Sequence, residues 1–404
     1  MIPEEDIYFK KIVPFSIDKI ALQFRVSQDL FSSFDVDAGT KLLIRSLASP
    51  SFTNAKKVLD LGCGYGIIGI ALKSLDPGRI IQMVDRDVLA VEYSKQNAAL
   101  NGFTDLQIFE SLGYDDLEAN DFDLITSNIP AKAGESAILY FLQDAACYLK
   151  PGGIVAVVVI APLKEMVKSI LDSDPNIVIS FHKESQNYSV FHYHFKKTGK
   201  GKDCQTEGLE KGVYDRQQMP FSFHKVDYTI KSAFSIPEFD TIDFQTDLVF
   251  DYLYSIRNRQ IERVLILNPG QGHIPVIVSK LFNPAGISIA DKDLLSLRVS
   301  LRNIILNNYP REKLSLFPVM GAPEEGSTSY ELGIVTFDKK ESRVVIEETA
   351  RQTVNRISSG GIALFASGST PITRLAEDLK KDKSIRIIAR KRNKGFSLLI
   401  VERR

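Results

Sequence analysis

The sequence predicts two α/β domains in tandem, each built on a mostly parallel sheet with helices on both faces. Its 404 residues exceed what one hydrophobic core commonly supports, because single cores stop growing at about 250–300 residues. In each half, short β-rich runs alternate with helical stretches, which is typical of a parallel sheet covered on both faces. The second half also repeats the first, so the same architecture is expected twice.

The repeat has a constant shift of 206 residues from position 36 to position 101. Further along the shift becomes 208, where Gly152 and Gly153 before one apolar run match Gly360 and Gly361 before another. A repeat of this length indicates a duplicated domain. The matched pairs include Asp37 with Asp243, Thr40 with Thr246, Gly66 with Gly272, Asp85 with Asp291, Asn97 with Asn303 and Asn101 with Asn307.

In the first half the expected elements follow in order. Residues 57–61 (KVLDL) and 80–85 (IIQMVD) are apolar runs that predict buried strands, and a helical stretch lies at 89–102. Residues 122–128 (FDLITSN) and 153–160 (GIVAVVVI) predict two further strands. Between the halves, residues 196–220 are rich in Gly and Lys and poor in apolar residues, which favours a linker. We therefore expect a first domain at 1–198, a linker at 199–220 and a second domain at 221–404.

Composition excludes several classes of protein. Lys plus Arg and Asp plus Glu both number 50, so a strongly polycationic protein is excluded although a local basic face is not. The amino terminus lacks the pattern of a secretory signal, and no run approaches the ~18 apolar residues that span a bilayer. Cys63, Cys147 and Cys204 are scattered and odd in number, without metal spacing. These features favour a cytoplasmic protein with no membrane contact and no metal, and they leave the oligomeric state open.

The most informative segment is residues 58–69, VLDLGCGYGIIG, where a strand turns into a helix through alternating glycines. Gly64 to Gly69 satisfies the GxGxxG pattern, which by itself also fits a nicotinamide or flavin cofactor. Three additions favour S-adenosylmethionine: Asp60 before the loop, Asp85 at the end of the second strand, and the sequence from Asn128 to Pro130 at the end of the fourth.

Each of these features has a chemical role in cofactor binding. Asp60 can meet the methionine amino group, directly or through water, whereas the same charge would repel a pyrophosphate. Asp85 can accept hydrogen bonds from both ribose hydroxyls. The glycines allow positive φ and close approach of backbone N–H groups to the methionine carboxylate. The full set predicted to bind the cofactor is Asp60, Gly62, Cys63, Gly64, Gly66, Asp85, Arg86, Ser111, Leu112 and Asn128.

Three segments, VLDLGCGYGIIGIAL, MVDRDVLAVEYSKQNAALNG and FDLITSNIPAKAG, resemble the small-methyltransferase-domain family that includes the ribosomal RNA guanine-N2 methyltransferases. The upstream segment with Phe31, Asp37, Gly39 and Thr40 is also similar. The resemblance covers about residues 15–197 and implies tandem class I, Rossmann-like methyltransferase domains with seven-stranded sheets. It also implies RNA, in particular ribosomal RNA, as the partner.

The resemblance places the methyl transfer at Asn128, Ile129 and Pro130. The Asn128 side-chain oxygen and the Ile129 carbonyl are candidate acceptors for the hydrogens of a base amine. The family motif is Asn-Pro-Pro followed by a bulky residue, so Ile129 and Ala131 depart from it. A base then needs stacking from another residue, for which Phe31, Phe34 and Tyr188 are candidates.

Two alternatives to RNA methylation remain open: a methyltransferase acting on a small molecule or a protein amide, and a non-catalytic RNA-binding or assembly factor. The second domain is expected to be degenerate, because Ile266 replaces the acid, Asn268 a glycine, and Pro275 stands where Gly69 opens the helix. Its basic carboxyl-terminal run, which includes Arg390 to Arg392, fits either a phosphate-binding face or a charged sheet edge.

Overall fold

The computed structural model describes residues 6–30, 34–49, 52–199, 202–324 and 329–404. The chain forms two compact units, unit 1 (Met1–Tyr214) and unit 2 (Asp215–Arg404), and each is described by itself. The division falls inside the segment expected to be a linker. Within that segment the Gly208 N–H donates to the Asp115 carboxylate at 2.7 Å, and Asp215 begins a strand of unit 2. Gly208 is thus hydrogen-bonded to unit 1, whereas Asp215 already belongs to a strand of unit 2.

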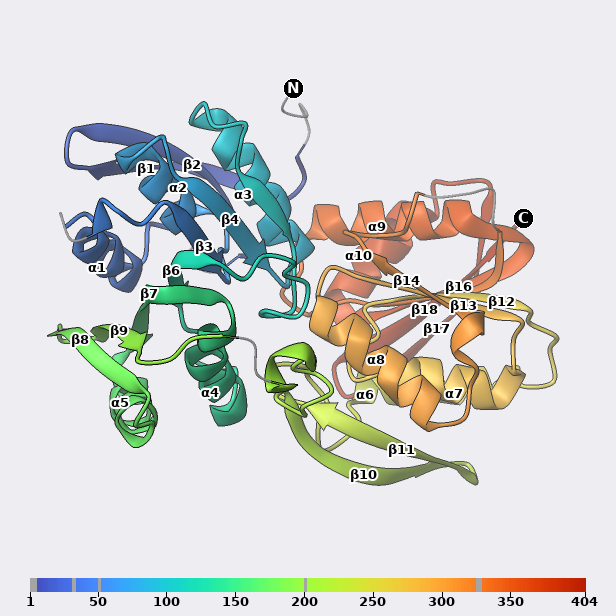
Figure 1. The fold of residues 1–404 in the computed structure, drawn as a ribbon. Helices are drawn as coiled ribbons and strands as arrows, with labels where there is room; N and C mark the ends of the chain where they lie inside the picture. Colours follow the sequence, from blue (N-terminus) through green and yellow to red (C-terminus); the bar gives the residue numbers. More distant parts are fainter. Residues whose placement is uncertain (1–5, 31–33, 50–51, 200–201, 325–328) are drawn as a thin grey trace. The chain divides into compact units, whose positions relative to one another are not determined.

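Unit 1 carries a two-stranded hairpin and a seven-stranded sheet (Figure 1). Its elements are β1 (Phe9–Ile17), β2 (Ile20–Ser27), α1 (Ala38–Leu47), β3 (Lys57–Leu61), α2 (Ile67–Leu75), β4 (Ile80–Asp85), α3 (Val88–Leu100), β5 (Gln107–Glu110), β6 (Phe122–Asn128), α4 (Glu135–Gln143), η2 (Asp144–Cys147), β7 (Leu149–Ile160), η3 (Ala161–Leu163), α5 (Lys164–Ser173), β8 (Ile177–Glu184), β9 (Tyr188–Phe195) and η4 (Lys202–Gln205). The sheet order is β5-β4-β3-β6-β7-β9-β8, and β9 runs in the direction opposite to that of the other six strands.

Unit 2 repeats the strands and α-helices of this plan in the same order. It contains β10 (Asp215–Phe223), β11 (Val226–Ala233), α6 (Phe244–Ser255), β12 (Arg263–Leu267), α7 (His273–Phe282), β13 (Gly286–Asp291), α8 (Leu294–Leu306), η5 (Arg311–Lys313), β14 (Leu314–Pro318), β15 (Tyr330–Thr336), α9 (Arg343–Arg356), β16 (Ile357–Gly368), α10 (Ser369–Leu379), β17 (Ile385–Asn393) and β18 (Phe396–Arg403). The sheet order β14-β13-β12-β15-β16-β18-β17 corresponds strand for strand to that of unit 1. The prediction of two mostly parallel seven-stranded sheets is confirmed, whereas the hairpins β1–β2 and β10–β11 were not foreseen.

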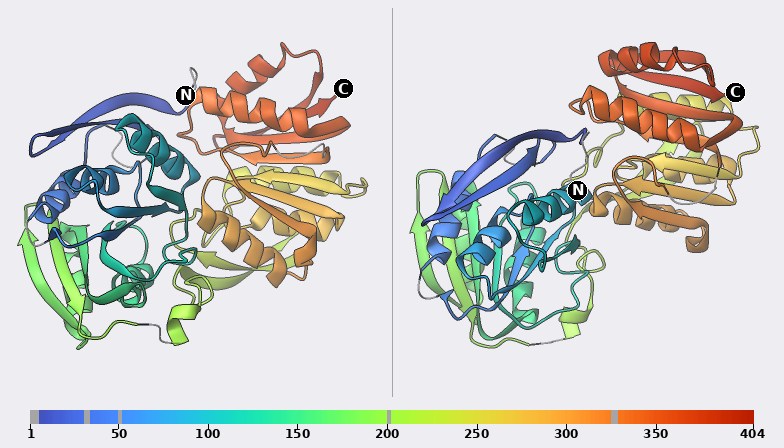
Figure 2. Two further views of the ribbon diagram at one scale, coloured as in Figure 1. Left: turned by 45° about the horizontal axis from the view of Figure 1, so that its top comes forward. Right: turned by 90° about the horizontal axis from the view of Figure 1, so that it is seen from above.

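Helices cover both faces of each sheet, as the views of unit 2 show (Figures 1 and 2). Alternate residues of β12 explain why. Val264 and Ile266 join a core with α6, α7 and α8, while Leu265 and Leu267 join a separate core with α9 and α10. A strand buried on both faces must be apolar at every position, and so β12 reads as a continuous apolar run.

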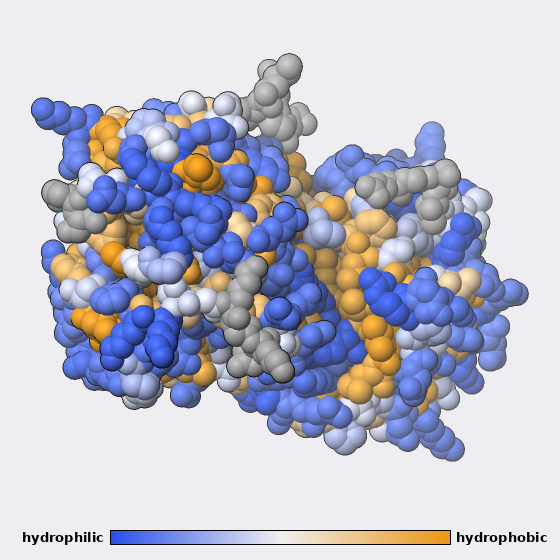
Figure 3. Space-filling view, in the orientation of Figure 1, coloured by the Kyte–Doolittle hydropathy of each residue, from blue (hydrophilic) through white to orange (hydrophobic). Residues whose placement is uncertain are grey.

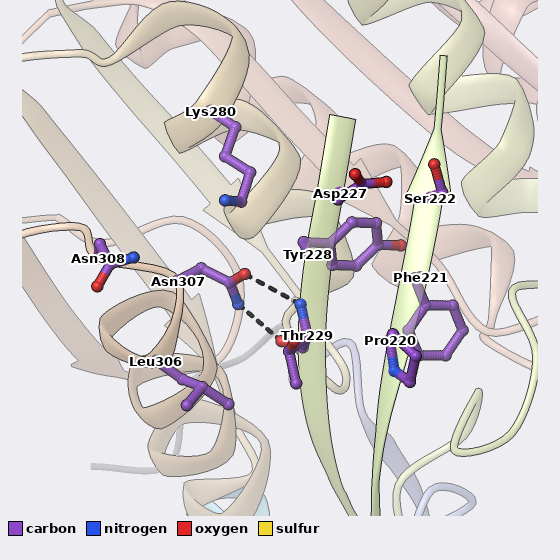
Figure 4. Close-up of a pocket in the computed structure, with 10 residues that line it drawn as sticks. All are labelled: Pro220, Phe221, Ser222, Asp227, Tyr228, Thr229, Lys280, Leu306, Asn307 and Asn308. Atoms are coloured by element: carbon purple, nitrogen blue, oxygen red, sulfur yellow. Dashed lines mark hydrogen bonds between the residues drawn. The ribbon is translucent and has the colours of Figure 1, made fainter. Parts of the chain in front are cut away.

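Each hairpin is fastened to its unit by two asparagines of one helix, which explains why these asparagines recur in the repeat. In unit 2, Asn303 accepts from the Lys231 N–H at 2.8 Å and donates to the carbonyls of Lys231 and Gln271. Asn307 bonds the N–H and carbonyl of Thr229 (Figure 4). Asn97 and Asn101 make the same contacts in unit 1.

Beside the asparagine contacts of each hairpin lies an open groove. In unit 2 it measures about 510 Å³ and is bordered by the turn of the β10–β11 hairpin and the ends of α7 and α8 (Figure 4). The corresponding groove of unit 1 measures about 500 Å³. Because the ends of these helices lie at the amino ends of the strands, both grooves are on the side away from the glycine loops.

Replacing Asn303 by alanine is expected to destabilise unit 2 by roughly 1–3 kcal/mol, because a buried side chain that satisfies three backbone groups is lost. Chemical denaturation of the full chain measures the effect. Asn355→Ala, at an exposed position on α9, is the matched control and should leave the unfolding midpoint unchanged. Equal unfolding midpoints for both variants would contradict a stabilising role for the Asn303 hydrogen bonds.

The cysteine pattern gave no sign of pairing, yet Cys147 and Cys204 form a disulfide with their Cα atoms 5.6 Å apart. The two residues are 57 positions apart in sequence, and the chain brings them together after β9. Cys63 is a free, buried thiol.

Hydrophilic residues dominate the visible face of each unit, with smaller hydrophobic patches between them (Figure 3). Within the part of the chain that the structure describes, no helix is long and apolar enough to cross a membrane. In the same residues, no group of three or more His, Cys, Asp or Glu side chains is arranged to hold a metal ion.

Candidate cofactor and methyl-transfer site

The residues expected at the site come from the carboxyl ends of three strands of unit 1. Asp60 lies on β3, Asp85 ends β4 and Asn128 ends β6. The chain crosses from β3 to β4 on one side and reaches β6 on the other, so the strand order reverses between β3 and β6. Ligands of open α/β sheets bind at such a reversal.

The glycine loop has the backbone conformation that its sequence predicts. Gly62, Gly64 and Gly66 have φ values of 72°, 58° and 91°, a region that disfavours residues with a side chain. A Cβ on Gly62 or Gly64 would meet nothing within 4 Å, so open space lies over the loop where a ligand fits. A Cβ on Gly66 would lie 2.8 Å from the Met83 side chain, so this glycine serves packing rather than ligand access.

Asp60 is fully buried beneath the loop, where its Oδ2 accepts from the Gly69 N–H at 2.8 Å. Its Oδ1 has no hydrogen-bond partner in the structure. Burial raises the pKa of the Asp60 carboxyl to about 7, against the Gly69 hydrogen bond and with repulsion from Asp85 adding to the effect. A buried carboxylate with an unused oxygen fits a cationic ligand, because a nearby positive charge favours its ionised form.

This pKa predicts a pH-dependent affinity for S-adenosylmethionine. The folded pKa of Asp60 lies above the ordinary value of 3.8, so between these values the native protein binds more protons than the unfolded chain and stability falls as pH rises. The cationic amino group of S-adenosylmethionine favours the ionised carboxylate of Asp60. The affinity for the cofactor should therefore rise with pH over the same range. We expect affinity to increase by at most about tenfold per pH unit as pH approaches 7, and then to level off.

Calorimetric titration at pH values from 5.5 to 7.5 measures this dependence. Asp60→Asn removes the titration and should flatten the curve over the same range. An equally steep curve in that variant would assign the pH dependence to another group.

Asp85, predicted to bind the ribose, braces the glycine loop. Its Oδ2 accepts from the Gly64 N–H at 2.9 Å and its Oδ1 from the Asp87 N–H at 3.0 Å. The following residue, Arg86, is half-buried.

The remaining residues predicted to contact the cofactor have mainly structural contacts. The Ser111 N–H donates to the Asp85 carbonyl, and its buried hydroxyl donates to the Gly113 carbonyl, so its polar groups hold their own turn. Leu112 is buried beside it. Cys63 donates its N–H to the Val84 carbonyl, and burial raises the pKa of its thiol well above 9.0, so it remains a thiol.

Asn128, Ile129 and Pro130 lie together at the end of β6. Asn128 Nδ2 donates to Thr40 Oγ1 at 2.9 Å and is 3.4 Å from Asp37 Oδ2. Ile129 is buried and its N–H donates to the Val158 carbonyl, whereas Pro130 is exposed. The Asn128 side chain is thus held through its amide nitrogen, with its oxygen on the other side.

The candidates for base stacking differ in their placement. Phe34 is 75% exposed, with Lys10 Nζ 3.2 Å from its ring centre. The Tyr188 hydroxyl instead donates to Asp37 Oδ1 at 2.6 Å, so this ring is tied into the structure. Phe31 lies outside the described residues. Of the two candidates that the structure describes, Phe34 is the one with an exposed ring.

Unit 2 keeps the backbone turn of this site but places its own side chains in part of it. Asn268 replaces Gly62 and has φ 56°, and its Nδ2 donates to the Thr336 carbonyl at 2.8 Å. Gln245 replaces Gly39, and its Nε2 lies 3.4 Å from the Phe337 carbonyl and 3.2 Å from the Ala366 carbonyl. Phe337 occupies the position of Ile129, so the carbonyl expected to accept a base amine is covered.

Two further replacements in unit 2 affect residues that form a single hydrogen bond in unit 1. In unit 1 the Asp60 carboxylate accepts from the Gly69 N–H. In unit 2 the corresponding residues are Ile266 and Pro275, an apolar side chain and a residue with no N–H. Unit 2 therefore lacks both the acid and its donor. Asp291 remains at the position of Asp85, and its Oδ1 accepts from the Asp293 N–H as Asp85 Oδ1 does from the Asp87 N–H, but Asp291 is only 8% exposed.

The strand order, the glycine loop and the acids at the strand ends define unit 1 as a class I methyltransferase fold. The family model described as Methyltransferase small domain matches residues 21–190. An uncharacterized Bacillus subtilis protein, YbxB, is 36% identical over 137 residues, which are 34% of this chain and 67% of that protein. The chain belongs to the methyltransferase small domain family.

Two further relatives are ribosomal RNA methyltransferases. Ribosomal RNA large subunit methyltransferase G of Shewanella woodyi is 32% identical over 161 residues, 37% of this chain and 38% of that protein. Ribosomal RNA small subunit methyltransferase C of Hahella chejuensis is 32% identical over 141 residues, 34% of this chain and 40% of that protein. The chain thus matches only about two fifths of the length of each.

One solved structure matches both units. The Thermus thermophilus 16S rRNA N2 G1207 methyltransferase, in complex with AdoMet and guanosine, covers 98% of both chains with a TM-score of 0.67 and 14% identity. At that identity the match shows a shared two-domain fold. Together with the family, it makes unit 1 a methyltransferase domain of the S-adenosylmethionine-dependent class and unit 2 a degenerate copy.

Proposed function

We propose that unit 1 transfers a methyl group from S-adenosylmethionine to an exocyclic base amine, the N2 of guanine, in ribosomal RNA. The observation that carries the proposal is the Asn128 side chain, which is held by its amide nitrogen at the end of β6 beside the open glycine loop. Its oxygen is then available to accept from an amine. The named activities of the Shewanella and Hahella relatives support the same substrate class.

The residues of this chain provide positioning rather than strong acid or base chemistry. Bound cofactor supplies a methyl group activated on a sulfonium. The amine nitrogen forms its bond to the methyl carbon as the sulfur–methyl bond breaks, and the nitrogen then gives a proton to water. Acceptors at Asn128 Oδ1 and the Ile129 carbonyl orient the amine and stabilise the positive charge that develops on it.

The substrate is tested by methyl transfer to RNA from cells that lack the gene. Purified protein with radiolabelled cofactor should label ribosomal RNA, and mass spectrometry of the digested nucleosides should show N2-methylguanosine. Asn128→Ala is the control for contaminating activity. Label in a small-molecule or protein fraction alone would replace RNA with another amine or amide substrate. Cofactor binding without label in any fraction would favour the non-catalytic role.

We further propose that the protein acts in the cytoplasm, where its RNA substrate is made. Thiols are kept reduced in that compartment, so Cys147 and Cys204 are expected there as the dithiol. Reduction should therefore leave methyl transfer unchanged.

Unit 2 lacks the acid and the first glycine of the cofactor loop, which Ile266 and Asn268 replace. We propose that unit 2 instead supports RNA binding. Its basic run lies on β17, at the edge of the sheet. Arg390 donates to the Ser369 carbonyl, whereas Lys394 Nζ is 4.5 Å from the centre of the Phe244 ring. Lys394 lies in the turn that follows β17.

A further inference from the structure

Three side chains from distant parts of unit 1 form one hydrogen-bonded chain that ends at Asn128. The Tyr188 hydroxyl, at the start of β9, donates to Asp37 Oδ1 at 2.6 Å. Asp37 is the N-cap of α1, and its Oδ2 accepts from the Thr40 N–H at 3.1 Å. The same oxygen is 3.4 Å from Asn128 Nδ2, which also donates to Thr40 Oγ1 at 2.9 Å.

This chain determines which end of the Asn128 amide faces the site. A carboxylate only accepts hydrogen bonds, so Asp37 requires the NH₂ group of Asn128 on its side. The reversed amide would place its oxygen beside the carboxylate, where like partial charges repel. Asn128 Oδ1 is consequently directed away from Asp37, with the orientation that a donor such as a base amine needs.

The hydroxyl of Tyr188 fixes the carboxylate in turn. The hydrogen bond to Asp37, together with burial, raises the pKa of Tyr188 to about 12, so the phenol keeps its proton at neutral pH. Gly39 makes room for the ring, because a Cβ at this position would lie 2.5 Å from Tyr188 Cδ1. The approach of Tyr188 to Asp37 therefore depends on a glycine.

Unit 2 provides an internal comparison that separates this arrangement from helix capping. Asp243 occupies the position of Asp37 and caps α6 by accepting from the N–H groups of Gln245 and Thr246, at 2.8 and 2.9 Å. The position of Asn128 is taken by Thr336, and the position of Tyr188 by Phe396, which has no hydroxyl. Capping alone thus retains the aspartate, whereas the tyrosine hydroxyl and the asparagine are absent together.

We propose that Asp37 and Tyr188 are positioning residues for methyl transfer: Tyr188 fixes the Asp37 carboxylate, which holds Asn128 with its side-chain oxygen toward the base amine. This inference rests on the proposed function, since it concerns the acceptor for that amine. It assigns a role to two residues that lie outside the glycine loop.

The first test compares single-turnover rates of methyl transfer in the full-length protein. We expect a loss of about tenfold for Tyr188→Phe and about 10²-fold for Asp37→Asn, because a displaced acceptor costs rate without affecting cofactor binding. The dissociation constant for S-adenosylmethionine and the melting temperature should stay at the wild-type values. Asp243→Asn makes the same change at the N-cap of α6 and should leave the rate unchanged.

Coupling to Asn128 is tested in the Asn128→Ala background. If Tyr188 acts through Asn128, Tyr188→Phe should cause no further loss there. The same tenfold loss in both backgrounds would show an independent effect and overturn the proposal. An unchanged rate in Tyr188→Phe alone would also overturn it.

A spectroscopic measurement separates this inference from the proposed function. The side-chain NH₂ signals of Asn128 in a ¹⁵N-asparagine-labelled protein are identified by their absence in Asn128→Ala. They should shift in Tyr188→Phe and Asp37→Asn and remain in place in Asp243→Asn. Unmoved signals in the first two variants would overturn the positioning role. Shifted signals in a protein that methylates no guanosine would instead overturn the proposed substrate and leave the orientation of Asn128 supported.

Discussion

Asn128→Ala is expected to lower the rate of methyl transfer by about 10²–10³-fold, while S-adenosylmethionine binds as in the wild type. The Asn128 oxygen is an acceptor aimed at the amine, and its contribution grows as positive charge develops on the nitrogen. Loss of such an interaction lowers the rate of the chemical step rather than ground-state binding.

The measurement is a single-turnover assay with saturating cofactor, paired with calorimetric titration of the same preparation. Asn128→Asp is an informative companion, because a second carboxylate beside Asp37 would be repelled from the wild-type position. A full-rate Asn128→Ala enzyme would move the acceptor role to the Ile129 carbonyl or to another group.

The second large effect is expected at Asp85. Asp85→Ala should weaken S-adenosylmethionine binding by about 10–100-fold, because hydrogen bonds to a charged group contribute about 1.5–3 kcal/mol. The variant removes the expected ribose acceptor and also the brace on the Gly64 N–H. Calorimetry should give one site per chain for the wild type.

Asp291→Ala is the matched control, since Asp291 occupies the corresponding strand end of unit 2. That variant should bind cofactor with unchanged stoichiometry and affinity. Two sites per chain, or equal losses in the two variants, would mean that unit 2 retains a cofactor site and that its degenerate loop has been misinterpreted.

The repeat, the glycine loop and the strand-end acids made most of the fold predictable. Positive φ at Gly62 and Gly64 leaves a direct mark on the sequence, because other residues are strained there. The sequence gives a weaker indication of the hairpin β1–β2. The hairpin contacts the body of unit 1 through the side chains of Asn97 and Asn101, and long-range bonds of this kind have no sequence period.

The site was predictable in its residues but not in its connections. Asp37 and Asn128 both stand out in the sequence, yet 91 positions separate them. Tyr188 was considered as a surface for a stacked base, whereas its hydroxyl is engaged by Asp37. Only the packing of β9 against β7, together with Gly39, brings this ring to α1.

The replacements at Ile266 and Pro275 restrict which single substitutions in unit 2 could restore the contact found in unit 1. Restoring aspartate at Ile266 alone would bury a carboxylate beside Pro275, which has no N–H to offer it, and restoring glycine at Pro275 alone would gain no partner. Each single step back is unfavourable or without benefit, although both steps together would rebuild the contact. The packing of unit 2 therefore opposes a return to the acid–donor contact by single substitutions.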